Sequence, residues 1–554
     1  MPSLGTFAFV LHTHLPYSRH AGRWPHGEEW LYEAACETYI PLAEMLRSLP
    51  DDLQANLTMS LTPVLLEQLA APEVIAGTED YMADRARRAS EDVARFEAAG
   101  DAQLAALAHF YHDWYSGRRR ALVDLLDGDL VGAFRALSHR GRIEPLSSGA
   151  THGYLPLLSR DSSIYAQVRT GLETHRRHLS EAAQGFWLPE CAYRPACTDQ
   201  DGTIRPGIEA FLAAQGTRFF MVESHAIEGG SAPTSREDLP EFYLPAGLTG
   251  RPAVRTLATT GYTTALPYLV GNSNVAAIGR NRRLSMQVWS ADLGYPGDPA
   301  YREFHKKDAQ SGLQYWAVSG PGVDLGAKRP YDPQAAQERV TAHAQHFAAQ
   351  VIEELAQQAE LHGDRALVTA VFDTELFGHW WFEGVQWLGQ VLRILGQDER
   401  VTVRPIADYL SEYPPEAAIE LPPSSWGAGG DDRTWNNSLT AGMWDVIHQC
   451  EREGEELAQV RDPDRLPFVA QAERELLLAQ SSDWPFLITT GQAAEYARRR
   501  FDEHVERFRL LSRLARAQSL TQADRDYLRA TEAKDDLFAF LNPEWFARRQ
   551  GRAN

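Results

Sequence analysis

Two short stretches place carboxylates where they could act as a nucleophile or as a general acid and base. Glu190 stands in GFWLPECAYRP, among apolar and aromatic residues, in a run too irregular for a regular helix or strand. Asp373 follows the apolar run Ala366 to Phe372 and precedes the aromatic segment LFGHWWFEG. A carboxyl group in such surroundings is either perturbed for catalysis or is a loop residue beside a local cluster. Glu375 and Glu383 compete with Asp373 for the catalytic role.

Histidines form a second group of candidates. In FAFVLHTHLPY, an apolar run ends at His12 and His14, and Pro16 stops the pattern. His152 follows the small-residue turn in IEPLSSGATHGY, and His225 follows the apolar run in TRFFMVESH. Imidazoles at strand ends could hold zinc with Asp373, as in an amidohydrolase-type barrel. They could instead hydrogen-bond a substrate or only close a turn.

Tryptophans in polar loop sequence supply a third signal. The chain has 14 tryptophans. Flat rings complement the CH faces of pyranose sugars, while nearby Asp, Asn and His side chains bind the hydroxyls. Each ring taken singly is better explained as part of a core, but the group in loops favours a carbohydrate ligand. The rings in question are Trp24, Trp30, Trp289, Trp380, Trp381, Trp426 and Trp435.

The elements that must position these residues alternate between strand and helix. Apolar runs end at His12, at Glu223 and at Asp373, and helical stretches separate them. The clearest helix begins at Asp332 and Pro333, a good cap and first-turn pair, and stops near Gly363. This order predicts a parallel α/β barrel whose active site lies at the carboxyl ends of the strands.

Two regions depart from that alternation. The segment from about Glu79 to Arg135 is helical in pattern, which predicts a helical insertion rising from a barrel loop. After the Pro-rich link EYPPEAAIELPPSS, residues 424–554 again have a helical pattern, with one apolar face formed by Ala497, Phe501, Val505 and Phe508. We therefore expect a catalytic domain over residues 1–415, its insertion at about 79–135, and a separate helical carboxyl-terminal domain.

Composition excludes several classes of function. The formal net charge is -21, from 75 acidic and 54 basic residues, and such a surface repels nucleic acid and anionic lipid. The sequence has neither an amino-terminal signal pattern nor an apolar run of about 18 residues, so we expect a cytoplasmic protein. Four scattered cysteines are too few for a disulfide scaffold, and reduced thiols are expected at Cys36, Cys191, Cys197 and Cys450.

Taken together, these segments resemble the ordered motifs of glycoside hydrolase family 57, and most of all those of its members that branch 1,4-α-glucans. The similarity runs nearly from end to end. It rests on HTHLPY, GATHGYLPLL, GFWLPECAYRP, VWSADLGYPGDP with YREFHKK, FDTELFGHWWFEG, SSWG with TW, and SSDWPFL. The resemblance implies an incomplete (β/α)7 barrel with a helical insertion and a helical carboxyl-terminal domain. That fold agrees with the independent pattern of strands and helices.

The resemblance also implies roles for single residues. Glu190 matches the family's nucleophile and Asp373 its general acid and base, which act in a retaining reaction with carboxyl groups about 5 to 5.5 Å apart. Trp30, Trp381 and a loop tyrosine, Tyr262 in preference to Tyr243, are further substrate-binding candidates, although that loop could also be an ordinary surface loop. Matches to the sugar site are His12, His14 and His152, the aromatic walls Trp289, Trp426 and Trp435, and Asp483 with Trp484 in a motif that reaches toward the cleft.

The expected activity is cleavage of an α-1,4-glucan, such as amylose or a glycogen-like polysaccharide, and transfer of the chain to a 6-hydroxyl. A hydrolase or a 4-α-glucanotransferase of the same family is the nearer alternative. The zinc-dependent barrel, and a glucan-binding protein without catalysis, are more distant ones. The zinc alternative leaves GFWLPECAYRP and the tryptophan-rich loops without a role. We expect no metal, no other cofactor, and no nucleic acid, membrane or obligate protein partner.

Overall fold

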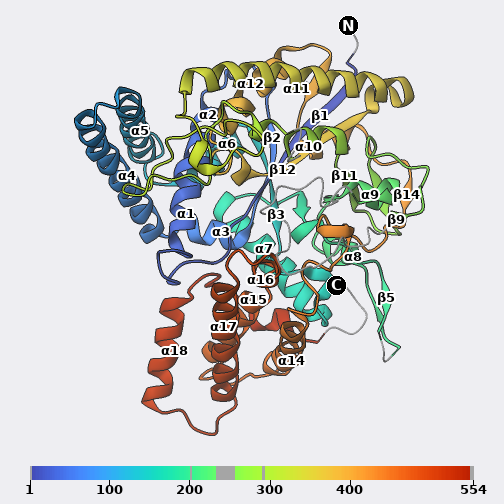
Figure 1. The fold of residues 1–554 in the computed structure, drawn as a ribbon. Coiled ribbons are helices and arrows are strands. Elements are labelled where there is room, and N and C mark those ends of the chain that lie inside the picture. Colours follow the sequence, from blue (N-terminus) through green and yellow to red (C-terminus); the bar gives the residue numbers. More distant parts are fainter. Residues whose placement is uncertain (1–2, 200–201, 233–255, 290–293, 549–554) are drawn as a thin grey trace.

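A curled sheet of ten strands organises the molecule (Figure 1). The computed structural model describes residues 3–199, 202–232, 256–289 and 294–548. The ladder runs in the order β12 (Leu367–Asp373), β1 (Gly5–Thr13), β2 (Leu57–Leu61), β3 (Ile143–Ser148), β4 (Gly185–Trp187), β7 (Phe219–Val222), β11 (Ala276–Gly279), β10 (Tyr268–Val270) and β14 (Ala418–Ile419). β13 (Val401–Val403) pairs with β1 beside this path.

Seven successive strands, from β12 to β11, are all parallel to their neighbours. In the described part of the chain no ladder joins β11 to β12, so the barrel is incomplete. Individual hydrogen bonds span the gap between these two strands. The Thr369 hydroxyl donates to the Gly279 carbonyl at 2.6 Å, and the backbone N–H of Asn281 donates to the Thr369 carbonyl at 3.0 Å. This architecture confirms the predicted incomplete (β/α)7 barrel.

Alternate residues of the strands enter two different cores. Phe7, Phe9 and Leu11 of β1 pack outward against the surrounding helices. Ala8 and Val10 face the barrel interior, where they meet residues such as Leu146 and Val371. A strand of a parallel sheet is covered on both faces, so the side chains on both of its faces are apolar and buried. Because side chains alternate along a strand, His12 lies on the same inward face as Ala8 and Val10.

Helices cover the outer face of the sheet (Figure 1). The long α11 (Pro333–His362) begins where Asp332 accepts N–H groups from Gln334 and Ala335, and it ends at Gly363, whose φ is 64°. These are the boundaries that the sequence predicted. The other helices of this part are α1 (Glu28–Ala34), α2 (Ile40–Arg47), α3 (Pro63–Leu69), α6 (Leu130–His139), α7 (Asp161–Leu179), α8 (Ile208–Ala213), α9 (Ser224–Glu228), α10 (Arg282–Trp289), α12 (Gly384–Gln397) and α13 (Ile406–Glu412).

Two helical regions lie outside the barrel. α4 (Pro72–Ala98) and α5 (Ala102–Arg120) pack side by side at the left of Figure 1, so the helical segment begins earlier than the expected Glu79. At the bottom of the view lie α14 (Ala441–Leu457), α15 (Leu466–Ala479), α16 (Asp483–Thr490), α17 (Ala494–Ala515) and α18 (Gln522–Lys534). The apolar face predicted for α17 is buried, which confirms the helical pattern of that segment.

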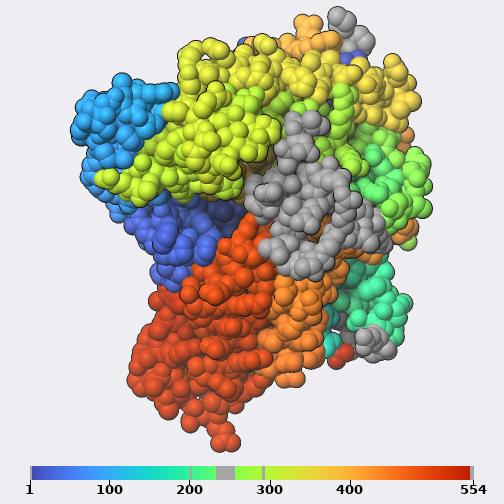
Figure 2. All heavy atoms as spheres, in the orientation of Figure 1, coloured from blue at the N-terminus to red at the C-terminus, as the bar shows by residue number. Residues whose placement is uncertain are grey.

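The carboxyl-terminal helices are fastened to loops that leave the barrel strands. The Tyr17 hydroxyl donates to the Lys534 carbonyl at 3.1 Å, and Arg19 pairs with Asp536 at 2.7 Å. In Figure 2 the red carboxyl-terminal segment lies directly against the dark-blue amino-terminal segment. The loop after β3 is joined as well, since the Ser482 N–H donates to the His152 carbonyl at 3.0 Å. The start of α16 is thereby held at the mouth of the barrel.

Two further observations concern the chain as a whole. All four cysteines are free thiols. Over the described ranges, no helix combines the length and the apolar character that a bilayer crossing requires.

Candidate active site

Glu190 is held in an unusual backbone conformation directly after β4. Its φ of 63° and ψ of 22° lie in the left-handed region, which costs a residue with a Cβ roughly 1–2 kcal/mol. Its carbonyl accepts the N–H of Trp426 at 3.0 Å, which helps to hold the turn. A conformation of this kind persists only where the surroundings maintain it, and such sites are often functional.

Both carboxylate oxygens of Glu190 accept a hydrogen bond. The Trp426 indole N–H donates to Oε2 at 2.8 Å, and the Ser482 hydroxyl donates to Oε1 at 2.9 Å. Burial raises the pKa of Glu190, while these two donors and the charge of His14 lower it in part and Asp483 raises it. Donors aimed at both oxygens favour the ionised form and fix the direction of the carboxylate. The arrangement suits a nucleophile that must be ionised although it is mostly buried.

Asp373 ends β12 on the face of the strand that lines the barrel interior. It shares the parity of Leu367 and Val371, which line the barrel interior. The register pairs Asp373 with His12 across the β12–β1 ladder, and His12 in turn pairs with Ser60 on β2. These three side chains therefore lie in a row on one face, at the carboxyl ends of three adjacent strands.

A buried thiol lies within the electric field of both candidate carboxylates. Burial raises the pKa of Cys191, and the charges of Glu223, Glu190 and Asp373 raise it further, against a lowering by Arg280. The thiol therefore stays protonated and is a poor nucleophile. Both carboxylates therefore lie close enough to the Cys191 thiol for their charges to affect its pKa.

Three imidazoles stack beside Glu190. The rings of His14 and His152 lie 3.9 Å apart, and those of His12 and His152 lie 5.0 Å apart. On its other side His12 stacks on Trp187, with ring centroids 4.3 Å apart and planes inclined by 10°. His152 Nδ1 lies 3.7 Å from Glu190 Oε1. The predicted histidine cluster thus lies at the mouth of the barrel, beside the predicted nucleophile.

Only one of the three imidazoles has a carboxylate bonded to its ring. Burial lowers the pKa of His12 and of His152 well below the usual value, and the positive charge of His14 lowers both further. Burial also lowers the pKa of His14, but Asp483, in contact at 3.1 Å, raises it together with the charges of Glu190 and Glu375, so the pKa of His14 is raised overall. Of the three imidazoles, His14 is therefore the one whose surroundings favour the protonated form, while burial favours neutral His12 and His152.

Glu375, one of the competitors of Asp373, lies under the histidine cluster. The Tyr39 hydroxyl donates to its Oε1 at 2.6 Å, and the backbone N–H of His14 donates to the same oxygen at 3.2 Å. Burial raises the pKa of Glu375 to about 7, against these donors. The other competitor, Glu383, accepts the backbone N–H of Arg302 at 3.1 Å. Glu383 therefore holds a loop in place.

Comparison with known proteins assigns most of the chain to described sequence families. The sequence profile described as glycosyl hydrolase family 57 matches residues 8–422, and the profile of the carboxyl-terminal region of 1,4-α-glucan branching enzymes matches residues 446–546. The chain belongs to glycoside hydrolase family 57. Together the two profiles match most of the chain.

Relatives within family 57 cover nearly the full length. A 1,4-α-glucan branching enzyme of Thermococcus kodakarensis is 41% identical over 96% of this chain and 77% of its own length. A probable 1,4-α-glucan branching enzyme of Mycobacterium tuberculosis is 34% identical over 91% of each chain. The crystal structure of a family 57 branching enzyme from Pyrococcus horikoshii has a TM-score of 0.86 at 37% identity, covering 99% of this chain and 97% of that one. An α-amylase of Thermotoga maritima has a TM-score of 0.79 at 28% identity, covering 98% of this chain and 99% of that one.

The aromatic candidates of this family 57 chain separate into two groups. Trp426 is half-buried, donates to Glu190, and packs edge-on against Trp187 with centroids 5.1 Å apart. Trp30 is half-buried and packs against His26 and Tyr496. Trp289, the last residue of α10, retains a small exposed fraction of 8%. Trp30 and Trp426 can still offer a ring surface to a sugar, whereas Trp289 is largely buried.

Trp381, Trp435 and Trp484 are placed differently from the expectation. Their exposed fractions are 1%, 1% and 0%, so none presents a ring face to a ligand in this structure. Trp435 lies on Tyr154 with centroids 4.6 Å apart, and the Trp484 indole donates to the Leu478 carbonyl at 2.8 Å. Their burial corrects the view that they line the sugar site. The mistake has a simple cause, because loop aromatics can equally pack beneath a cleft.

The loop tyrosine is also engaged elsewhere. Tyr262 is 40% exposed, and its hydroxyl donates to the Ala418 carbonyl of β14 at 3.3 Å. Its ring packs edge-on against Tyr268 of β10, with centroids 4.9 Å apart. β14 is four strands from β4, which carries Glu190, in the order β4, β7, β11, β10, β14. In this arrangement Tyr262 does not cover Glu190. Tyr243 lies outside the described residues.

The geometry of the histidines bears on the zinc alternative. His12 bonds Ser60 and His152, His152 bonds His12 and Ser482, and His14 bonds Thr62 and Asp483, so every ring nitrogen of the cluster has a protein partner. A zinc ligand would have to give up one of these bonds. The observed bonding therefore favours a hydrogen-bonding role.

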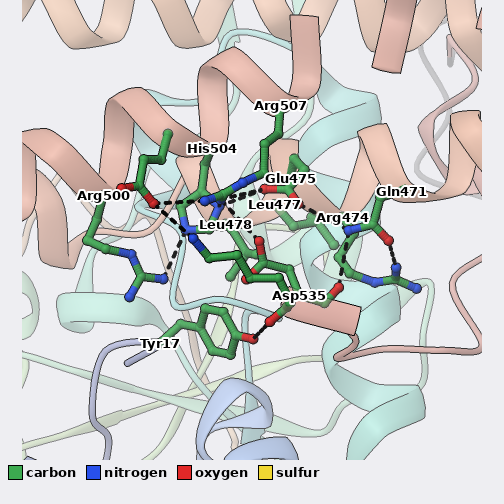
Figure 3. Close-up of polar contacts among 12 residues, drawn as sticks. Tyr17, Gln471, Arg474, Glu475, Leu477, Leu478, Arg500, His504, Arg507 and Asp535 are labelled. Atoms are coloured by element: carbon green, nitrogen blue, oxygen red, sulfur yellow. Dashed lines mark hydrogen bonds and ion pairs between the residues drawn. The ribbon is translucent and has the colours of Figure 1, made fainter. Parts of the chain in front are cut away.

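Among the described residues, the group with metal-like spacing lies elsewhere, in the carboxyl-terminal helices (Figure 3). It consists of Glu475, His504 and Asp535. His504 Nδ1 lies 2.7 Å from Glu475 Oε2, while Arg507 Nη1 lies 3.5 Å from that oxygen and 3.1 Å from Asp535 Oδ2. The guanidinium already supplies the positive charge between the two carboxylates. This cluster is an ion network that joins α15, α17 and the end of α18.

Sequence reasoning missed two serines of the site. Ser60 bonds His12 at 2.6 Å, and Ser482 bonds both His152 and Glu190. Ser482 directly precedes Asp483 in SSDWPFL, so that motif could have pointed to it. Ser60 carries no such signal, because NLTMSLTP is a strand without a charged end.

Proposed function

We propose that the chain is a 1,4-α-glucan branching enzyme that works by double displacement, with Glu190 as nucleophile and Asp373 as general acid and base. The observation that carries the proposal is an ionisable carboxylate held by Trp426 and Ser482 at the same barrel mouth as Asp373. The relatives named as branching enzymes cover nearly all of the chain, which supports the choice of activity.

The first displacement cleaves the donor glucan. Protonated Asp373 gives its proton to the glycosidic oxygen as the bond from that oxygen to the anomeric carbon breaks. Glu190 attacks the same carbon and forms a glycosyl ester with inversion. The hydrogen bonds from Trp426 and Ser482 hold the attacking carboxylate in one direction. Burial limits competing solvent at the carboxylate.

The second displacement forms the branch. Asp373, now a carboxylate, takes the proton of an incoming glucan 6-hydroxyl, and that oxygen attacks the anomeric carbon. The ester bond to Glu190 breaks, and its carboxylate returns to the two donors. Two inversions give net retention and an α-1,6 linkage. Water in place of the 6-hydroxyl would give hydrolysis.

A direct product analysis tests the proposal. Purified protein is incubated with amylose, and α-1,6 linkages, new reducing ends and the length distribution of α-1,4 chains are measured in the same sample. Branching predicts α-1,6 linkages with few new reducing ends. Reducing ends without branches would identify an α-glucan hydrolase, the second candidate, which the structural similarity to an α-amylase favours. Altered chain lengths with neither signal would identify a 4-α-glucanotransferase. The Glu190→Gln variant controls for contaminating activities.

A further inference from the structure

A continuous chain of hydrogen bonds runs through the histidine cluster and ends on Glu190. Ser60 Oγ lies 2.6 Å from His12 Nδ1, and His12 Nε2 lies 3.1 Å from His152 Nε2. His152 Nδ1 lies 2.8 Å from Ser482 Oγ, and Ser482 Oγ lies 2.9 Å from Glu190 Oε1. Five side chains from five separate segments thus form one line, which we call the relay.

The acceptor at the end of the relay determines the position of every proton along it. An ionised Glu190 can only accept, so the Ser482 hydroxyl donates to it and accepts from His152 Nδ1. A neutral His152 with its proton on Nδ1 must accept at Nε2, so His12 donates from Nε2. His12 Nδ1 then accepts from the Ser60 hydroxyl. All four hydrogen bonds point toward Glu190, and none of the relay donors is left without an acceptor.

The environment strengthens the relay. Ser60, His12, His152 and Ser482 have exposed fractions of 0%, 3%, 2% and 0%. Hydrogen bonds in such dry surroundings are stronger than in water, and aligned bonds polarise one another. His14 is bonded to Thr62 and Asp483 and stacks on His152 from outside the relay. The imidazoles of the relay itself are neutral.

Ser482 is the one relay member contributed by the carboxyl-terminal helices. It directly precedes α16, and its backbone N–H is tied to the His152 carbonyl at 3.0 Å. The residue after it, Asp483, bonds His14. The carboxyl-terminal region therefore reaches the barrel mouth and completes the surroundings of the catalytic carboxylate.

We propose that Ser482 is a positioning residue for Glu190, and that the relay from Ser60 through His12 and His152 orients the Ser482 hydroxyl toward that carboxylate. The inference deepens the proposed function and rests on the nucleophile assignment. It gives the carboxyl-terminal region a part in catalysis, since without Ser482 one oxygen of Glu190 loses its donor. Because the Ser482 oxygen accepts the proton on His152 Nδ1, the hydroxyl proton of Ser482 is directed toward Glu190.

The primary test replaces Ser482 by Ala. One hydrogen bond to a charged group is lost, so we expect kcat for glycosidic cleavage to fall about tenfold to a hundredfold, with KM within about threefold. Ser482→Thr keeps the hydroxyl and should recover most of kcat. Ser512→Ala removes another buried hydroxyl, on α17 and outside the site, and should leave kcat within about twofold. A Ser482→Ala variant with unchanged kcat would overturn the proposal.

A double-mutant cycle tests the relay beyond Ser482. Ser60→Ala should lower kcat in the wild type but have little further effect in the Ser482→Ala background, because the two serines act only through the imidazoles between them. Additive losses would refute a continuous relay. If Ser482→Ala fails to fold, nitrogen-15 NMR of the wild-type protein tests the relay instead, because it reports which ring nitrogen of each histidine carries the proton. We expect the proton on Nδ1 of His152 and on Nε2 of His12, and the opposite tautomers would overturn the proposal.

The assay separates this inference from the proposed function. Cleavage of α-1,4 bonds is followed by the loss of iodine staining of amylose, a signal that a branching enzyme, a hydrolase and a glucanotransferase all produce. A wild-type protein that cleaves without branching would reject the proposed function and leave the relay testable. Intact branching with an unaffected Ser482→Ala variant would reject only the relay.

Discussion

Replacing Trp426 by Phe separates two roles that the ring plays beside Glu190. The phenyl ring keeps an aromatic surface for sugar, but it removes the indole N–H that donates to Glu190 Oε2 at 2.8 Å. A hydrogen bond to a charged group contributes about 1.5–3 kcal/mol, and about 1.4 kcal/mol corresponds to one pKa unit. The pKa of Glu190, already raised by burial, should therefore rise by about one to two further units.

The sign of the effect follows from the reaction. Glu190 must be ionised to attack, so kcat/KM falls on the acid side as the carboxylate takes up a proton. A higher pKa moves that acid limb to higher pH, and activity below the limb falls about tenfold for each unit. The alkaline limb should stay where it is.

The assay is the pH profile of kcat/KM for amylose cleavage in both proteins. Glu375 is a second buried carboxyl group of the site with a raised pKa, of about 7, so the comparison is repeated in a Glu375→Gln background. The same shift in both backgrounds assigns the limb to Glu190. An acid limb that does not move in Trp426→Phe would refute the claim that the indole N–H stabilises the ionised nucleophile.

Four further predictions follow from the same structure. Glu190→Gln and Asp373→Asn should each abolish turnover while circular dichroism and Tm stay near wild type. Azide added to Glu190→Ala should yield an inverted glycosyl azide; an inverted glycosyl azide from Asp373→Ala would instead make Asp373 the nucleophile and Glu190 the general acid and base. Exhaustive chelation should leave amylose cleavage unchanged, because protein partners occupy the imidazole nitrogens of the barrel mouth; activity lost to a chelator and restored by zinc would revive the zinc-dependent barrel. Tyr262→Ala should leave the ratio of branches to reducing ends unchanged, because its hydroxyl is bonded at β14; a lower ratio would return Tyr262 to the site. Arg302→Leu should lower the free energy of unfolding by about 3–5 kcal/mol in urea titrations, because it removes the guanidinium that pairs with buried Glu37 at 3.0 Å and leaves only Tyr115 and His379 beside that carboxylate among the described residues; a loss below 1 kcal/mol, on the order of a surface pair, would contradict that reasoning.

The parts of the site that could be predicted from sequence depend on local order. The apolar run that ends at His12 predicts a strand, and its alternating side chains determine which face His12 shares with Ala8 and Val10. The same holds for Asp373 at the end of its own run. Where parallel strands form a barrel, the residues at their carboxyl ends share one rim. Strand identity and parity therefore sufficed to bring these two residues to one mouth.

Aromatic residues show where such reasoning stops. Trp426, Trp435 and Trp484 all stand in segments that resemble family motifs, yet only the first keeps an exposed face. A ring beneath a cleft and a ring that lines it satisfy the same sequence pattern, because both need a large apolar surface near polar neighbours. Only the packing of the neighbouring segments decides which face of each ring is covered.

The sequence by itself determined the strands that end at His12, Glu223 and Asp373 and the helical character of the carboxyl-terminal region, and its resemblance to family 57 singled out the two carboxylates proposed for catalysis. The tertiary structure alone decided which donors hold Glu190. Its partners Trp426 and Ser482 lie 236 and 292 residues away along the chain, and each hydrogen bond forms only when the carboxyl-terminal segments dock on the barrel mouth. Hydrogen bonds depend on distances of about 3 Å and on direction, and no local pattern carries that information across separate segments.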